Sequence, residues 1–322
     1  MTTPSGITQR VTVTRRDVWV GMLLYPRHTL PTAAAPILVA SCLAYHDRLF
    51  ALGPALAALL AGWLVQLGGV VTDNYNNLQR HGDDKEHPQF VEALKAGVVT
   101  FGQLKLAITA CYGVAMLAGL YCVYVGGVPI LVVGLASIAA SLAYSTGPFP
   151  LGDRLGLGDP LFFVFFGLVQ VMGAYYVQAA SILSSPLTVG IPAGTVTFTG
   201  LLVSLPMAAL TTNILVIDNI RDLEFDREKK EHTLAVLIGP RWSRIEYLGL
   251  LALAYSVPVW LFLRHGFGAW VLLPLLSIPY AALVAKRVFR FTTHEELIPM
   301  TPQAGQVLLM YAVLFAVGLA RG

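Results

Sequence analysis

Residues 50–72, FALGPALAALLAGWLVQLGGVVT, form a stretch of 23 residues without a charged side chain. About 20 mostly apolar residues suffice for a helix to cross the hydrocarbon core of a bilayer, so this stretch predicts a membrane-spanning helix. The next twelve residues, 73–84, read DNYNNLQRHGDD and are almost entirely polar. The sequence therefore predicts a membrane crossing with a cluster of acids and amides at one end.

The composition of the whole chain supports the same assignment. Its 322 residues are 56% hydrophobic and 12% charged, with a mean hydropathy of +0.68. Soluble domains contain about 25% charged residues, so lipid must solvate much of the apolar surface of this chain. A soluble globule is thus excluded, and a net charge of +3 is too small to indicate a nucleic-acid partner. The three cysteines show no CxxC spacing and predict neither a disulfide framework nor a zinc site.

Nine stretches are long and apolar enough to span the membrane, which predicts an all-α polytopic protein. Residues 1–29 are polar and basic, and we interpret them as an N-terminal segment at the membrane surface that precedes a single transmembrane domain, residues 30–322. The nine predicted crossings are 30–47, 50–72, 103–125, 127–145, 160–180, 193–216, 245–264, 267–286 and 302–320.

Lysine and arginine are distributed very unevenly between the two sides of this nine-helix arrangement. Seventeen of the 21 basic residues fall on the side of the N-terminus, whereas Arg48, Arg264 and Arg321 fall on the other side. Because cytoplasmic loops carry the excess of positive charge, we expect the N-terminus in the cytoplasm and the C-terminus outside.

The acidic residues are concentrated in two short segments. Eleven of the 18 Asp and Glu lie between residues 73 and 92 or between 218 and 231. Both segments follow the cytoplasmic ends of predicted crossings, the second and the sixth. This equivalence suggests two four-helix blocks, about 30–145 and 160–286, followed by a ninth helix, with each block supplying half of one site.

The spacing of these acids favours a divalent metal site. Carboxylates four residues apart lie on one helical face, where like charges destabilise the helix unless cations balance them. Carboxylate and amide oxygens suit Mg²⁺, which commonly joins one or two carboxylates to substrate phosphates. The predicted metal ligands are Asp73, Asn77, Asp83, Asp218, Asp222 and Asp226.

Basic residues among these acids suggest a phosphorylated ligand. Arg221, Lys229 and Lys230 could bind phosphate oxygens, and an apolar tunnel below would accommodate a lipid tail. One alternative is a solvated, salt-bridged rim without function. A second is a transporter, whose acids would lie near the bilayer midplane rather than at helix ends.

Four motifs together resemble one protein family. They are RHTLP at residues 27–31, DNYNN at 73–77 followed by Asp83, YSTGPFPLG at 144–152 followed by GLGD at 156–159, and DNIRDLEFD at 218–226 followed by TLAV at 233–236. In this combination the chain resembles the UbiA superfamily of intramembrane prenyltransferases, and within it the 1,4-dihydroxy-2-naphthoate polyprenyltransferases of menaquinone synthesis.

The resemblance implies a nine-helix bundle around a central cavity, in a bacterial or archaeal plasma membrane. It implies Mg²⁺-dependent transfer of a polyprenyl group from an allylic diphosphate to the naphthoate, with loss of CO₂, to give demethylmenaquinol. The catalytic residues that it implies are Asp73, Asn77, Asp218, Asp222 and Arg221. The substrate-binding residues are Arg27, Lys229, Lys230, Tyr144, Arg154, Asp159 and Tyr175.

The chain also departs from the family pattern. Asp73 stands where the family usually has Asn and Asn77 where it usually has Asp, His81 replaces a glycine, and Asp159 replaces a glutamate. The family's Gly-Lys pair reads Lys230-Glu231, so either Lys229 or Lys230 could be the phosphate-binding lysine. Another aromatic acceptor, or cyclisation of a prenyl diphosphate without an acceptor, therefore stays open.

Overall fold

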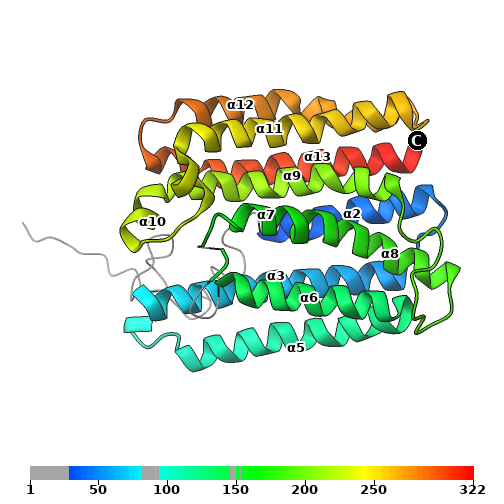
Figure 1. The fold of residues 1–322 in the computed structure, drawn as a ribbon, viewed down its shortest axis with the longest axis horizontal. Coiled ribbons are helices and arrows are strands. Elements are labelled where there is room, and N and C mark those ends of the chain that lie inside the picture. The colour runs from blue at the N-terminus through cyan, green and yellow to red at the C-terminus, as the bar shows by residue number, and fades with distance from the viewer. Residues whose placement is uncertain (1–28, 82–90, 92–93, 146–149, 153) are drawn as a thin grey trace, which may run out of the picture.

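A computed structural model describes residues 29–322 except 82–90, 92–93, 146–149 and 153, and the described residues form helices, turns and loops with no strand among them (Figure 1). In chain order the helices are α2 (Thr29–His46), α3 (Leu52–His81), α5 (Phe101–Gly126), α6 (Val128–Ser145), α7 (Gly158–Phe162), η1 (Phe163–Val169), α8 (Gln170–Leu183), α9 (Phe198–Arg221), α10 (Leu223–Lys229), α11 (Leu234–Arg264), η2 (Ala269–Ser277), α12 (Ile278–Arg290), η3 (His294–Leu297) and α13 (Met300–Arg321).

The long helices lie side by side along one common direction (Figure 1). Helix α9 packs against α11, α13 and η1, while α2 packs against α13 and α8. Helix α3 packs against α5, which lies at the opposite edge of the bundle from α12 (Figure 1). The predicted all-α bundle is therefore confirmed.

Within the described residues, seven segments are long and apolar enough to cross a membrane. They begin at Leu52, Phe101, Gly158, Phe198, Leu234, Ala269 and Met300. The two remaining predicted crossings, 30–47 and 127–145, correspond to α2 and α6, which have 18 residues each. The protein is integral to the membrane, and seven of the nine predicted crossings correspond to segments that are long and apolar enough to span it.

Two of the predicted boundaries were wrong. The crossing predicted at 193–216 begins at Phe198, because the Thr197 hydroxyl accepts a hydrogen bond from the Gly200 amide at 2.9 Å and caps the helix. The crossing predicted at 245–264 begins eleven residues earlier, at Leu234, and turns at Gly239, whose φ is +80°. The segment Leu234–Ile238 thus precedes a kink before the main span.

Burial divides the helices into a central one and peripheral ones. In α9, 78% of the most apolar 18-residue window is buried, compared with 11% in α5. Large apolar side chains of α5 and α6, including Leu106, Leu117 and Val132, are exposed. Because the chain is a membrane protein, these exposed side chains of α5 and α6 face lipid, whereas α9 is the central helix.

A short π-helix, η1, lies between α7 and α8 within the long segment Gly158–Leu183. It crosses α9 at Gly167, where an added Cβ would lie 2.1 Å from both Cα and Cβ of Ala208. Only glycine lets the two backbones approach so closely, as small residues do at helix crossings in membranes. This contact fixes η1, with its three phenylalanines, against the central helix.

Candidate active site

The three acids predicted as a stripe lie where the central helix ends. Helix α9 stops at Arg221, and Asp222 has φ −92° and ψ 3° before α10 begins. Backbone hydrogen bonds nevertheless continue across the break, from the Asp222 amide to the Asp218 carbonyl and from the Asp226 amide to the Asp222 carbonyl, each 2.9 Å long. The three acids therefore keep their i,i+4 relation, and all three line one cavity.

Arg221 links two of these carboxylates. Its Nη1 donates to Asp218 Oδ1 at 2.6 Å, while its Nε and Nη2 donate to Asp222 Oδ1 and Oδ2 at 2.9 and 2.5 Å. The Thr301 hydroxyl of α13 also donates to Asp218 Oδ1, at 2.6 Å. The two like charges are thus held together by one guanidinium, and the pair of bonds to Asp222 fixes its orientation.

Asp226 and Asp159 are more deeply buried than the other acids, at 5% and 3% exposed. Asp226 Oδ2 accepts a hydrogen bond from the Thr233 hydroxyl at 3.1 Å. The Asp159 carboxylate accepts from Asn219 Nδ2 at 3.1 and 3.3 Å. Asn219 lines the cavity and Asp159 does not, so Asp159 acts here by orienting the Asn219 amide.

The first acidic motif lies on the helix that forms another wall of the same cavity. Asp73 and Asn77 belong to α3, but their side chains lie outside the described structure, as do Asp83 and Arg27. Lining positions of α3 recur every three or four residues through 62, 66, 70 and 74. Asn74 is 6% exposed, and its Nδ2 has no hydrogen-bond partner among the described residues. Helix α3 thus brings a polar group of motif one to the cavity that the Asp218 stripe lines.

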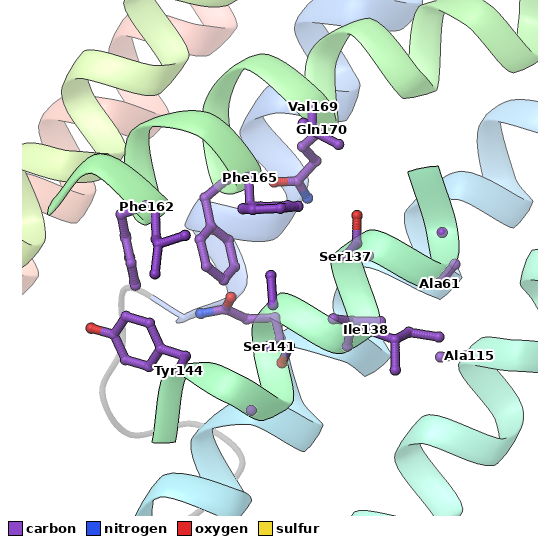
Figure 2. A pocket seen from close by; sticks show the side chains of 18 of the residues that line it. Ala61, Ala115, Ser137, Ile138, Ser141, Tyr144, Phe162, Phe165, Val169 and Gln170 are labelled. Carbon is purple, nitrogen blue, oxygen red and sulfur yellow. The ribbon is translucent and has the colours of Figure 1, made fainter. Parts of the chain in front are cut away.

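Below the acids the cavity is mostly apolar and has a volume of about 520 Å³. Helix α3 forms one wall, α5 and α6 form another, and η1 contributes Phe165 (Figure 2). Phe166 of η1 also lines the cavity. The rings of Tyr144 and Phe162 lie 5.8 Å apart, centroid to centroid, on the lining of this cavity (Figure 2). Phe163, which lies between Phe162 and Phe165 in the sequence, instead packs on the main core.

Besides Asp159, four of the predicted substrate-binding residues lie outside the cavity lining that the described residues form. The Tyr175 hydroxyl donates to Asp47 Oδ2 at 2.6 Å, at the far end of α2 from the acids. Arg154 lies in a loop joined to the start of α11 by the Gly156 amide, which donates to the His232 carbonyl at 2.8 Å. Lys229 places its Nζ 5.4 Å from the centre of the Phe225 ring, and Lys230 is exposed at the end of α10.

The sequence reasoning missed several polar groups of the site. For Gln66 and Gln170 the signal that could have revealed them is an isolated amide inside an apolar helix, because polar groups in membrane helices usually face a cavity or a partner. The missed residues are Gln66, Asn74, Gln170, Asn219, Glu231, Thr233 and Thr301.

The oxygen donors of this site suit a hard cation. In the described part of the chain, no three Asp, Glu, His or Cys side chains are placed to hold a metal by themselves. Asp218 and Asp222 nevertheless present carboxylates to the same guanidinium and the same cavity. Mg²⁺ usually takes one or two carboxylates and completes its shell with water and substrate phosphates, so this donor set fits it.

Comparison with known proteins agrees with the fold and the motifs. The sequence profile described as "UbiA prenyltransferase family" matches residues 33–300. A protein of Escherichia coli (strain K12) named 1,4-dihydroxy-2-naphthoate octaprenyltransferase is 30% identical over 315 residues, which cover 95% of this chain and 96% of that protein.

Two solved structures show the same architecture. The apo structure of a UbiA homolog from Aeropyrum pernix K1 has a TM-score of 0.68 at 17% identity and covers 89% of this chain and 96% of that one. A UbiA homolog from Archaeoglobus fulgidus bound to GPP and Mg²⁺ has a TM-score of 0.52 at 13% identity, covering 90% of this chain and 100% of that one. At these identities the solved structures establish the shared fold.

Proposed function

Because the chain belongs to the UbiA prenyltransferase family and is a prenyltransferase, we propose that it transfers a polyprenyl group from an allylic diphosphate to 1,4-dihydroxy-2-naphthoate. During the transfer the carboxylate of the naphthoate is lost as CO₂, and the product is demethylmenaquinol. One observation carries the proposal: Asp218, Asp222 and Asp226 line one end of a cavity whose remaining lining is mostly apolar. This arrangement matches a substrate with a charged head and a hydrocarbon tail. The name of the Escherichia coli relative supports the naphthoate as acceptor.

The acids would hold Mg²⁺, and we assign Asp218 and Asp222 as its ligands, together with Asp226 and with Asp73, Asn77 and Asp83 of motif one. Bound Mg²⁺ would neutralise the charge that develops on the departing diphosphate. The homolog from Archaeoglobus fulgidus was solved with GPP and Mg²⁺, which supports Mg²⁺ as the cation.

The residues of the chain itself contribute positioning and electrostatics. The Arg221 guanidinium carries five N–H donors and lies between two carboxylates. In the proposed reaction it would also donate hydrogen bonds to the diphosphate oxygens. Lys229, Lys230 and Arg27 would add positive charge at the rim. The Tyr144 and Phe162 rings offer π-faces to an allylic cation, and the apolar walls keep water from reaching it.

We further propose that the acids face the cytoplasm. The basic residues around them, with Arg221, Arg227, Lys229 and Lys230 in ten residues, are typical of a cytoplasmic segment. On this topology the C-terminal end of α13 lies outside. The proposed division into blocks 30–145 and 160–286 would then place α3 and α9 in equivalent positions.

The product identifies the reaction. Purified protein with Mg²⁺, a polyprenyl diphosphate and 1,4-dihydroxy-2-naphthoate is expected to yield the decarboxylated prenyl naphthoquinol, as measured by mass spectrometry. Chelation of the cation with EDTA should stop product formation, and added Mg²⁺ should restore it. Benzoate and homogentisate in parallel reactions test the alternative acceptors, and a cyclic terpene formed without any acceptor would contradict the proposal.

A further inference from the structure

Two glutamine side chains line the apolar part of the cavity, Gln66 of α3 and Gln170 of α8. Gln66 is 8% exposed, and its Oε1 has no hydrogen-bond partner among the described residues. The Oε1 of Gln170 is likewise buried and lacks a partner in the described part of the chain. A buried carbonyl oxygen without a donor is unfavourable, so both oxygens are suited to a ligand that supplies one.

The orientation of Gln170 is fixed by its other end. Its Nε2 donates to the backbone carbonyl of Ala33 at 2.8 Å. A carbonyl oxygen can only accept, so the amide nitrogen must face Ala33, and Oε1 is left for another partner. In Figure 2 the Gln170 side chain extends from α8 toward the space between Phe165 and Ser137.

The two amides lie close together on one wall. A Cβ added to Gly62 would lie 3.1 Å from Gln170 Nε2, and Gly62 is one helical turn from Gln66 on α3. Gln66 is eight positions before Asn74, which at 1.5 Å per residue is about 12 Å along the helix axis. The amides are therefore well below the polar end, and the intervening length leaves room for a diphosphate and its reacting carbon.

The chemistry of the candidate ligands separates them. A prenyl tail carries only C–H groups and would leave both amide oxygens unpaired. Water would pair them, but water inside the cavity would also consume an allylic cation. A ring hydroxyl supplies the donor, and the ring that carries it suits the apolar walls.

We propose that Gln66 and Gln170 accept hydrogen bonds from ring hydroxyl groups of the aromatic acceptor, so that they position it and select for hydroxylated rings. The inference rests on the proposed function, because it assigns a subsite to the acceptor of that reaction. Gln66 and Gln170 act as specificity-determining residues, apart from the acids that bind the diphosphate.

The test compares the variants Gln66→Leu and Gln170→Leu with the control Ser137→Ala in nanodiscs. Ser137 also lines the cavity, but its hydroxyl already donates to the Val133 carbonyl at 2.8 Å. Three ligands are titrated by calorimetry without diphosphate: 1,4-dihydroxy-2-naphthoate, its 1-O-methyl ether and its 4-O-methyl ether. The wild type and Ser137→Ala should bind the diol about 10-fold more tightly than either ether, whereas each glutamine variant should bind the diol and one of the two ethers within about twofold.

Transfer kinetics provide the second readout. The glutamine variants should raise KM for the diol while KM for the prenyl diphosphate stays unchanged. Gln66→Met keeps an unbranched side chain without the amide and should behave like Gln66→Leu, and the melting temperature of each variant verifies that it is folded. A glutamine variant that keeps the 10-fold preference over both ethers, or that changes KM for the diphosphate instead, would overturn the inference.

The binding readout needs no turnover, so the two proposals can fail separately. If the wild type prefers the diol but forms no prenylated product, the proposed function fails and the hydroxyl-binding role of the amides stands. If the wild type forms the product and the glutamine variants retain its ligand preference, the inference alone fails.

Discussion

Replacing Asp222 with alanine is expected to lower the rate of prenyl transfer by about 10³-fold or more, since single groups that stabilise developing charge contribute factors of 10² to 10³ and this carboxylate also binds the metal. The substitution removes both oxygens that orient Arg221 through its Nε and Nη2. The Asp218 carboxylate remains paired with that guanidinium. The initial rate of product formation at saturating Mg²⁺ measures the effect.

The matched control is Glu224→Ala, which removes a carboxylate two positions away. Glu224 is exposed and forms a surface ion pair with Arg227 at 3.0 Å, so its loss should change the rate by less than about twofold. Asp222→Asn keeps the size of the side chain and removes its charge, and it should be nearly as impaired as the alanine variant. Activity of Asp222→Ala within about tenfold of the wild type would contradict the assignment of Asp222 as a metal ligand.

Gly167→Ala is expected to have the largest effect on stability. Its new methyl group would lie 2.1 Å from Cα and Cβ of Ala208, so η1 and α9 must separate. Overpacking costs about 1–3 kcal/mol and more where backbone must move, which corresponds to a fall in the melting temperature of about 6 °C or more at the upper end of that range. The same movement displaces Phe165 and Phe166 from the cavity wall, so activity should fall as well. Thermal unfolding in detergent, followed by circular dichroism, measures the shift.

Gly173→Ala provides the comparison, because this glycine lies on α8, which continues directly from η1. An added Cβ there has no heavy atom within 4 Å, so alanine should leave the melting temperature unchanged or raise it slightly. Equal melting temperatures for Gly167→Ala and the wild type would show that the crossing of η1 and α9 tolerates separation.

Apolar runs and charge explain how much of the fold could be predicted. The stretch 50–72 predicts a spanning helix with a polar extension, and α3 indeed continues to His81 through the amides that follow. The i,i+4 spacing of Asp218, Asp222 and Asp226 predicts one stripe. The stripe persists in the structure, because backbone hydrogen bonds between residues four apart continue past the end of α9. Local patterns of this kind need no knowledge of the neighbouring helices.

The cavity walls could not be predicted, for a physical reason. In a membrane, side chains that face lipid and side chains that face an apolar cavity have the same hydrophobicity, so hydrophobic periodicity does not distinguish Leu117 on the surface from Phe165 on the cavity wall. The π-helical turn at η1 packs closely against α9, a segment distant in the sequence, and local patterns do not reveal such packing. Only isolated polar residues such as Gln66 and Gln170 indicate from sequence which face is internal.

The packing of α2 against α13 has a consequence for how the protein is made. These helices stand near opposite ends of the described sequence, yet Leu43 of α2 and Leu308 and Tyr311 of α13 belong to the same buried core. During synthesis at the ribosome α2 therefore forms long before α13, its main neighbour, exists. The core that these two helices share cannot form until α13 has been made, and until then the buried face of α2 must be covered by other groups.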